Sequence, residues 1–207
     1  FGGGRLPSYA SSIDRINYSN DTATASPKGP LSGDKKDLAA TSSSSFGYFG
    51  GGEGSGQLST VDRIDYLNDT ATVSSKGPLS SARKYLGGAG NANFGYFGGG
   101  WPPSKSFVDR VDYSNDTATA SPKGTLSAAR GYLSATGNQN FGYFGGGLGV
   151  SRVDRVDYSN DTANASPKGP LSAAKQYLAA TGNSDFGYFG GGQTVTTVDR
   201  IDYSNDT

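Results

Sequence analysis

The stretch VDRVDYSNDT at 108–117 decides how this chain folds, because near-copies of it recur along the whole sequence. The other copies are IDRINYSNDT at 13–22, VDRIDYLNDT at 61–70, VDRVDYSNDT at 153–162 and VDRIDYSNDT at 198–207. A spacing of 45 to 48 residues is typical of one supersecondary unit repeated in tandem. We therefore expect a single repeat array over 1–207, with units at 34–81, 82–128 and 129–173 and partial units at 1–33 and 174–207.

The composition excludes several classes of function. The 18 basic and 18 acidic residues balance, so no basic surface for nucleic acid or anionic lipid is expected. Cysteine and histidine are both absent, which removes disulfides, thiol and imidazole chemistry and most transition-metal sites. No apolar run approaches the roughly 20 residues that span a bilayer. We expect no metal, no cofactor, no nucleic-acid partner and no membrane insertion.

One unit from the middle of the chain predicts four short strands. They are expected at 82–90, 94–97 and 107–114, with an outer strand at 118–127 that contains Pro and Gly and so suits the edge of a sheet. The alternative is a helix over 126–137, where apolar residues have helical spacing. Strand is favoured there, because an isolated helix of about 12 residues is marginal. One unit is too small to fold alone, so neighbouring units must stack face to face.

The order of three motifs resembles the kelch repeat. FGYFGGG, VDRVDYSNDT and SPKGPLSAAR follow one another as the glycine-ended second strand, the tyrosine-bearing third strand and the Pro-to-Arg fourth strand of that family do. The family's tryptophan after the turn is missing and Ala or Thr stands in its place, so these units are divergent. The resemblance implies an all-β, kelch-like β-propeller of four-stranded antiparallel blades; a β-solenoid is the alternative. The units are also similar in style to long repetitive proteins of marine bacteria and of phage virions.

The first and last blades are expected to be incomplete. The second and third strands occur five times in the sequence, whereas the first and fourth occur four times. The chain also has no Met and begins inside a repeated motif. We expect either that the rest of a longer chain completes the fold, or that a neighbouring copy supplies the missing strands.

Variable loops after each triglycine are the first candidates for binding. They read RLPSYASS, EGSGQLST, WPPSKSF, LGVSR and QTVTT, and antiparallel strands place them on the rim opposite the constant NDT turns. The sole tryptophan, Trp101, is predicted to stack on a sugar ring or to anchor a partner protein. Lys105, Arg152 and Glu53 complete this speculative ligand-binding set. The alternatives are that the loops vary because nothing restrains them and that Trp101 plugs a blade edge.

Recurrent Asp-Arg pairs are predicted to be structural rather than catalytic. Ion pairing between blades explains them better than a glycosidase dyad, because no unit carries a unique pair of acids. The residues assigned to these inter-blade pairs are Asp62, Arg63, Asp109, Arg110, Asp154 and Arg155.

These observations predict a non-enzymatic structural or adhesive module of an extracellular, cell-surface or virion protein. Its expected partners are a glycan or host-surface receptor, together with other copies or the remainder of its own chain. A purely structural, self-assembling part is the second hypothesis. A glycan-cleaving propeller is the third, and it would need acids beyond Glu53, the only glutamate in the chain.

Overall fold

The fold is taken from a computed structural model, in which residues 1–4 and 7–207 are described. Regular structure in these residues consists of short β-strands and two single-turn 3-10 helices, η1 (Tyr113–Asn115) and η2 (Tyr158–Asn160). Neither helix of the described residues is long and apolar enough to cross a membrane.

The strands of the described residues form five antiparallel sheets, of which three are complete and four-stranded. The complete sheets are β3 (Ala39–Ser42), β4 (Phe46–Gly50), β5 (Val61–Asp65) and β6 (Ser74–Lys76); β7 (Gly87–Gly90), β8 (Phe94–Gly98), β9 (Val108–Asp112) and β10 (Ser121–Pro122); and β11 (Ser134–Gly137), β12 (Phe141–Gly145), β13 (Val153–Asp157) and β14 (Ser166–Lys168). The first sheet has only β1 (Ile13–Arg15) and β2 (Ser26–Lys28), and the last has β15 (Ala179–Gly182), β16 (Phe186–Gly190) and β17 (Val198–Asp202).

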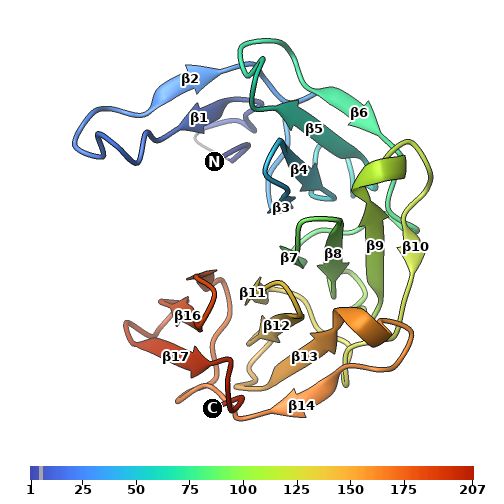
Figure 1. Cartoon of the computed structure of the whole chain (residues 1–207), viewed down its shortest axis with the longest axis vertical. Helices are drawn as coiled ribbons and strands as arrows, with labels where there is room; N and C mark the ends of the chain where they lie inside the picture. The colour runs from blue at the N-terminus through green and yellow to red at the C-terminus, as the bar shows by residue number, and fades with distance from the viewer. Residues whose placement is uncertain (5–6) are drawn as a thin grey trace.

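The sheets are the blades of a β-propeller. Figure 1 shows them side by side in an arc, with β3, β7 and β11 towards the middle and β6, β10 and β14 on the outside. The arc is open between the sheet that contains β1 and the sheet that contains β17. The predicted all-β propeller of four-stranded blades with incomplete first and last blades is thus confirmed, and the β-solenoid alternative is wrong.

Two local predictions need correction. The strand expected over 82–90 begins only at Gly87, because Tyr85 has a left-handed backbone with φ of 59° that a strand cannot contain. The alternative helix over 126–137 does not form. Tyr132 has the same left-handed conformation, and β11 follows it.

A phenylalanine seated on a glycine is the repeated contact between neighbouring blades. The last Phe of each FGYF motif lies against the first glycine of the preceding triglycine. A Cβ built on Gly98 would lie 2.7 Å from Cε1 of Phe144, and one on Gly50 would lie 2.7 Å from Cε1 of Phe97. Phe97 and Phe144 are fully buried as a result. Only glycine leaves room for the ring at these positions.

The second glycine of each triglycine is required for a different reason. Gly99 has φ of +70°, and a Cβ there would lie 2.6 Å from the carbonyl oxygen of Arg130 in the next blade. Both the backbone conformation and the close approach therefore exclude a side chain.

Stacked tyrosines form a second repeated contact between blades. Tyr113 of one blade stacks on Tyr48 of the preceding blade with ring centroids 4.5 Å apart, and its hydroxyl lies 2.8 Å from Oγ1 of Thr41. Tyr203 contacts Thr136 in the same way at 3.0 Å. Tyr158 is the exception, because Ala89 stands at the position of the threonine. The buried Tyr158 hydroxyl therefore has no hydrogen-bond partner among the described residues.

We expect Ala89→Thr to stabilise the chain by about 1 kcal/mol, because it gives the Tyr158 hydroxyl the partner that the equivalent tyrosines already have. Tyr158→Phe should be close to neutral, since it removes a hydroxyl that bonds to nothing. The matched Tyr113→Phe should lose about 1 kcal/mol, because it leaves Thr41 without its bond. Urea unfolding of the three variants measures this, and equal effects of the two Tyr→Phe changes would contradict it.

Candidate functional site

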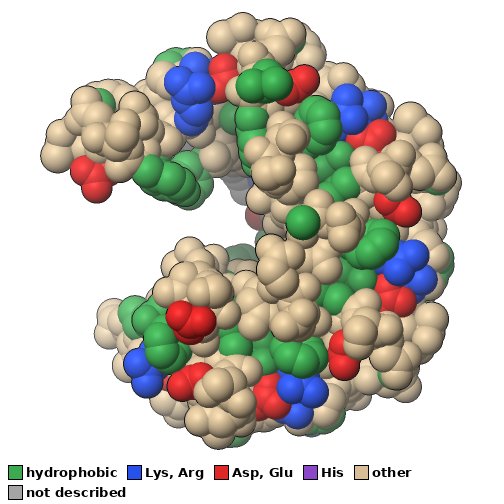
Figure 2. All heavy atoms as spheres, in the orientation of Figure 1, with side chains coloured by type: hydrophobic (Ala, Val, Ile, Leu, Met, Phe, Trp, Pro, Cys, Tyr) green, Lys and Arg blue, Asp and Glu red, His purple; other side chains and the backbone are tan. Residues whose placement is uncertain are grey.

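The two rims of the propeller carry different kinds of residue. The variable loops follow β4, β8, β12 and β16, whereas the NDT turns follow β5, β9, β13 and β17, and antiparallel pairing places them at opposite ends of the blades. Figure 2 shows basic and acidic side chains recurring around one face of the arc. The aspartates of the NDT turns are the acidic partners in ion pairs that repeat from blade to blade.

The arginines of the first four Asp-Arg pairs cross to the next blade. Arg110 Nη1 lies 2.7 Å from Asp161 Oδ2, and the hydroxyl of Tyr96 donates to the same oxygen at 2.9 Å. Arg63 and Arg155 reach the NDT aspartates Asp116 and Asp206 in the same way, at 2.8 and 2.7 Å. These contacts hold blades together on the constant rim.

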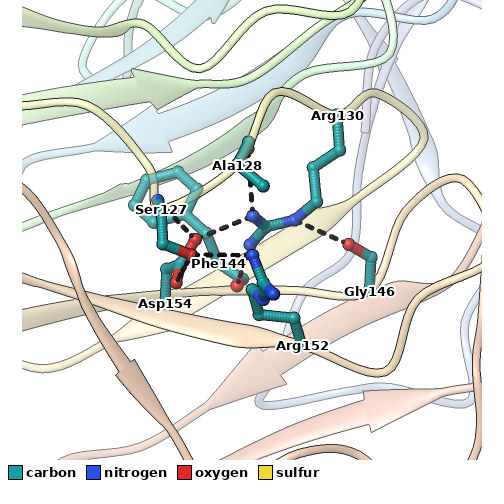
Figure 3. A network of polar contacts seen from close by, with 7 residues as sticks. All are labelled: Ser127, Ala128, Arg130, Phe144, Gly146, Arg152 and Asp154. Atoms are coloured by element: carbon teal, nitrogen blue, oxygen red, sulfur yellow. Dashed lines mark hydrogen bonds and ion pairs between the residues drawn. The ribbon is translucent and has the colours of Figure 1, made fainter.

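The aspartates of the last four pairs bind a different basic residue. Asp154 is fully buried and accepts Nη1 of Arg130 at 2.7 Å and the hydroxyl of Ser127 at 2.6 Å. Figure 3 shows these groups converging, with the Arg130 guanidinium also donating to the carbonyl oxygens of Phe144 and Gly146.

The same network recurs in the neighbouring units. Asp109 pairs with Arg83, and Asp62 pairs with Lys35. These basic residues lie on the segment that links the preceding blade to the aspartate's own blade. The prediction of ion pairs between blades is therefore correct for the arginines Arg63, Arg110 and Arg155. It is wrong for the aspartates Asp62, Asp109 and Asp154, which bind the segment that leads into their own blade.

Three tyrosines gather where the innermost strands begin. Tyr85, Tyr132 and Tyr177 precede β7, β11 and β15, and Asp37 holds the equivalent position before β3. The rings of Tyr85 and Tyr132 stack with centroids 3.9 Å apart, and those of Tyr132 and Tyr177 are 4.6 Å apart. We call these three residues the tyrosine cluster.

All four of these positions have a left-handed backbone. Their φ angles lie between 57° and 62°, a conformation that costs a bulky residue on the order of 1–3 kcal/mol. Backbone hydrogen bonds hold it: the amides of Tyr85, Tyr132 and Tyr177 donate to the carbonyls of Asp37, Tyr85 and Tyr132 at 2.9, 2.8 and 3.1 Å. Strain of this kind gathers at binding sites, so these residues are candidates for function.

The first residues of three variable loops, Glu53, Trp101 and Gln193, lie beside the tyrosine cluster. Trp101 forms a backbone bridge with Lys84, and its indole lies 6.2 Å from the Tyr132 ring between centroids. Glu53 accepts Nζ of Lys84 at 2.7 Å and Nζ of Lys36 at 3.0 Å. In the last blade the amide of Gln193 donates to the carbonyl of Gln176, next to Tyr177. The variable loops and the constant tyrosines therefore share one surface.

The charge states of this surface follow from its contacts. Hydrogen bonds from Lys84 and then Lys36 hold the pKa of Glu53 below its ordinary value, so the carboxylate is ionised at neutral pH. Burial raises the pKa of Tyr85 well above the usual range for tyrosine, and the Asp37 carboxylate raises it further. The Tyr85 hydroxyl therefore stays protonated and can donate hydrogen bonds.

The four loop residues expected to bind a ligand are not all brought together. Trp101 and Glu53 both contact Lys84 beside the tyrosine cluster. Lys105 places its Nζ over the Phe107 ring at 5.5 Å, and Arg152 Nη1 donates to Ser127 Oγ at 3.2 Å. Lys105 and Arg152 thus have contacts of their own, which belong to the loop and to the buried network.

The repeat pattern of the sequence does not single out the tyrosine cluster. Its signal is an aromatic residue at the same place before Leu86, Leu133 and Leu178. That regularity is equally compatible with a strand or a helix, because both place apolar residues in register. The spacing of apolar residues does not indicate a left-handed backbone.

Comparison with known proteins adds no further assignment: no protein-family model matches the chain, and no curated protein does. Within residues 1–4 and 7–207, no group of three or more acidic, His or Cys side chains is arranged to hold a metal ion.

We expect Arg130→Met to cost about 3–5 kcal/mol of stability, because it leaves the Asp154 carboxylate buried without a counter-charge. Arg130→Lys should cost clearly less, since lysine fills the same role at Lys35 and Lys175. Denaturant unfolding of both variants measures the difference. Equal losses would mean that the charge is not what the site needs.

Stability should also fall at acid pH through Asp62. Burial alone would raise its pKa, but hydrogen bonds from Lys35 and Ser32 outweigh burial and the pKa lies below its ordinary value. A carboxyl with a depressed pKa stabilises the folded chain above its unfolded pKa of about 4, and this contribution is lost as pH falls through the folded pKa. Urea unfolding from neutral pH downward should show a shallower loss in Asp62→Asn than in wild type. Parallel curves would exclude Asp62 as a source.

Proposed function

We propose that the chain is a kelch-like, non-enzymatic binding module in which constant blades present a variable rim to a carbohydrate ligand. The observation that carries this proposal is the tyrosine cluster, held in left-handed backbone and bordered by the first residues of three variable loops. Residues that differ between units stand there beside residues that recur. That combination suits a recognition surface on a rigid scaffold.

The chemistry of the surface favours a sugar. Aromatic faces of Trp101, Tyr132 and Tyr177 offer apolar platforms on which a pyranose ring can stack. Tyr177 is more than half exposed, at 55%, and so is accessible to a ligand. Glu53, Lys84 and the side chains of Gln176 and Gln193 supply acceptors and donors for hydroxyl groups.

The ionisation state of the acidic residue Glu53 favours ligand binding over glycoside hydrolysis. A glycosidase needs one carboxyl with a raised pKa to protonate the leaving group and a second carboxylate opposite it. Glu53 has the contrary environment, since two lysines hold it ionised. The Tyr85 hydroxyl remains protonated, so it acts as a hydrogen-bond donor and not as a nucleophile.

The proposal is tested on a glycan array, followed by calorimetry on the glycans that bind. Trp101→Ala and Tyr132→Ala should each weaken binding by about 2 kcal/mol, roughly thirtyfold in Kd, as removal of an aromatic anchor does. Leu67→Ala is the matched control, because Leu67 is an exposed apolar residue next to the NDT turn on the opposite rim. Absence of glycan binding by the wild type, or equal binding by all variants, would remove the proposal.

A further inference from the structure

Each interior blade presents a set of contact residues to the blade that follows it. The outer face of the last blade carries the same set without a following blade to contact. In interior blades, the first glycine of the triglycine receives a phenylalanine, the tyrosine of FGYF receives a second tyrosine, and the strand arginine receives an NDT aspartate. The corresponding residues of the last blade are Gly190, Tyr188 and Arg200. No phenylalanine ring lies on Gly190, and within the described residues Arg200 has no ion-pair partner.

This face of the last blade is also unusually open. Val198 is 65% exposed, although Val61, Val108 and Val153 at the same register are fully buried. Tyr188 is partly exposed, whereas its equivalent Tyr96 is fully buried. The blade therefore ends in an apolar face, and the guanidinium at its edge lies over the Phe186 ring without an ion-pair partner among the described residues.

The sheet of β1 and β2 carries the opposite half. Phe1, Tyr18 and Asp21 stand where the interior blades have the incoming phenylalanine, tyrosine and aspartate. Phe1 is 83% exposed and Tyr18 is 94% exposed. Asp21 is exposed, and it has no basic partner among residues 1–4 and 7–207.

The two halves face the same opening of the arc but do not meet. A groove of about 860 Å³ lies beside the β1–β2 sheet, lined by Phe1, Ile13 and Tyr18 together with residues of β3, β4 and β5, and it reaches Ala180 of β15 at the opening. Figure 2 shows the arc open through its full depth at this place. Within one chain the complementary residues therefore stay apart.

We propose that the exposed face of β15–β17 docks on the β1–β2 sheet of a second copy of this chain, head to tail. The interior interfaces identify the occupant: Phe1 would sit on Gly190, Tyr18 would stack on Tyr188, and Arg200 would pair with Asp21. The charges are complementary, and the apolar residues that each end exposes become buried. A contact between two different surfaces leaves a free half at each end, so it propagates into a ring or a filament.

The proposal is tested by sedimentation velocity of the full chain over a wide range of concentration. The wild type should associate more as concentration rises, and Arg200→Asp or Asp21→Arg alone should weaken association by about tenfold or more, because like charges then oppose each other. Mixing the two variants should restore it, since each then offers the opposite charge to the other. Both residues are exposed, so the fold should survive, and near-UV circular dichroism checks this.

A cysteine pair separates a second copy from closure of the arc within one chain. The chain has no cysteine of its own, so Tyr18→Cys in one copy and Thr181→Cys in another can be mixed and treated with a short bismaleimide crosslinker. A covalently linked dimer is the expected product. A wild type that stays monomeric at every concentration, association that survives Arg200→Asp, or a double variant that crosslinks only within itself would each overturn the proposal. None of these outcomes bears on glycan binding at the tyrosine cluster.

Discussion

A phenylalanine ring seated on a backbone with no side chain holds the blades of this propeller together. The ring of Phe144 lies where the Cβ of any residue other than glycine at position 98 would be. Because the same contact is made from blade to blade, it sets the separation of the sheets throughout the array. The stacked tyrosines and the Arg110–Asp161 type of ion pair then form at the distance that this contact allows. Removing the glycine would push the neighbouring sheet away and break all three contacts together.

Charge serves this fold in two distinct ways. The guanidinium of Arg110 is partly exposed and joins one blade to the next at the constant rim. The carboxylate of Asp154 is buried, and it pairs with Arg130, whose guanidinium also binds backbone carbonyls. The first kind fixes how blades follow one another. The second fixes where the chain enters a blade, because a buried carboxylate tolerates only a positioned cation.

Constant and variable residues occupy different parts of the propeller. Blade contacts and NDT turns occupy strands and one rim, where substitution would disturb a neighbour. The loops after the triglycines meet at the other rim, around residues whose left-handed backbone is maintained by hydrogen bonds from blade to blade. A scaffold of this kind can change its loops without changing its blades, which is the physical basis for the binding function proposed here.

Sequence spacing was sufficient for the architecture and for part of the site. Alternating apolar residues and regular glycines predicted the strands around 94–97 and 107–114 and their stacking into blades. Trp101 and Glu53 stood out because they are unique, and the structure places both beside Lys84. The tyrosine cluster could not be predicted in this way, because periodicity reports which residues are apolar and not the sign of φ. The same limit misplaced the beginning of the strand at Gly87.

The sequence by itself determined the repeat, the strand order and the glycines that the blades need, since these depend on local spacing and on the absence of a Cβ. Only the tertiary structure decided which charges meet. Asp109 and Arg110 are adjacent in the chain, yet one turns to Arg83 on the incoming connection and the other to Asp161 on the next blade. Successive side chains of a strand point to opposite faces, so their partners come from the packing of the blades, which no single unit contains.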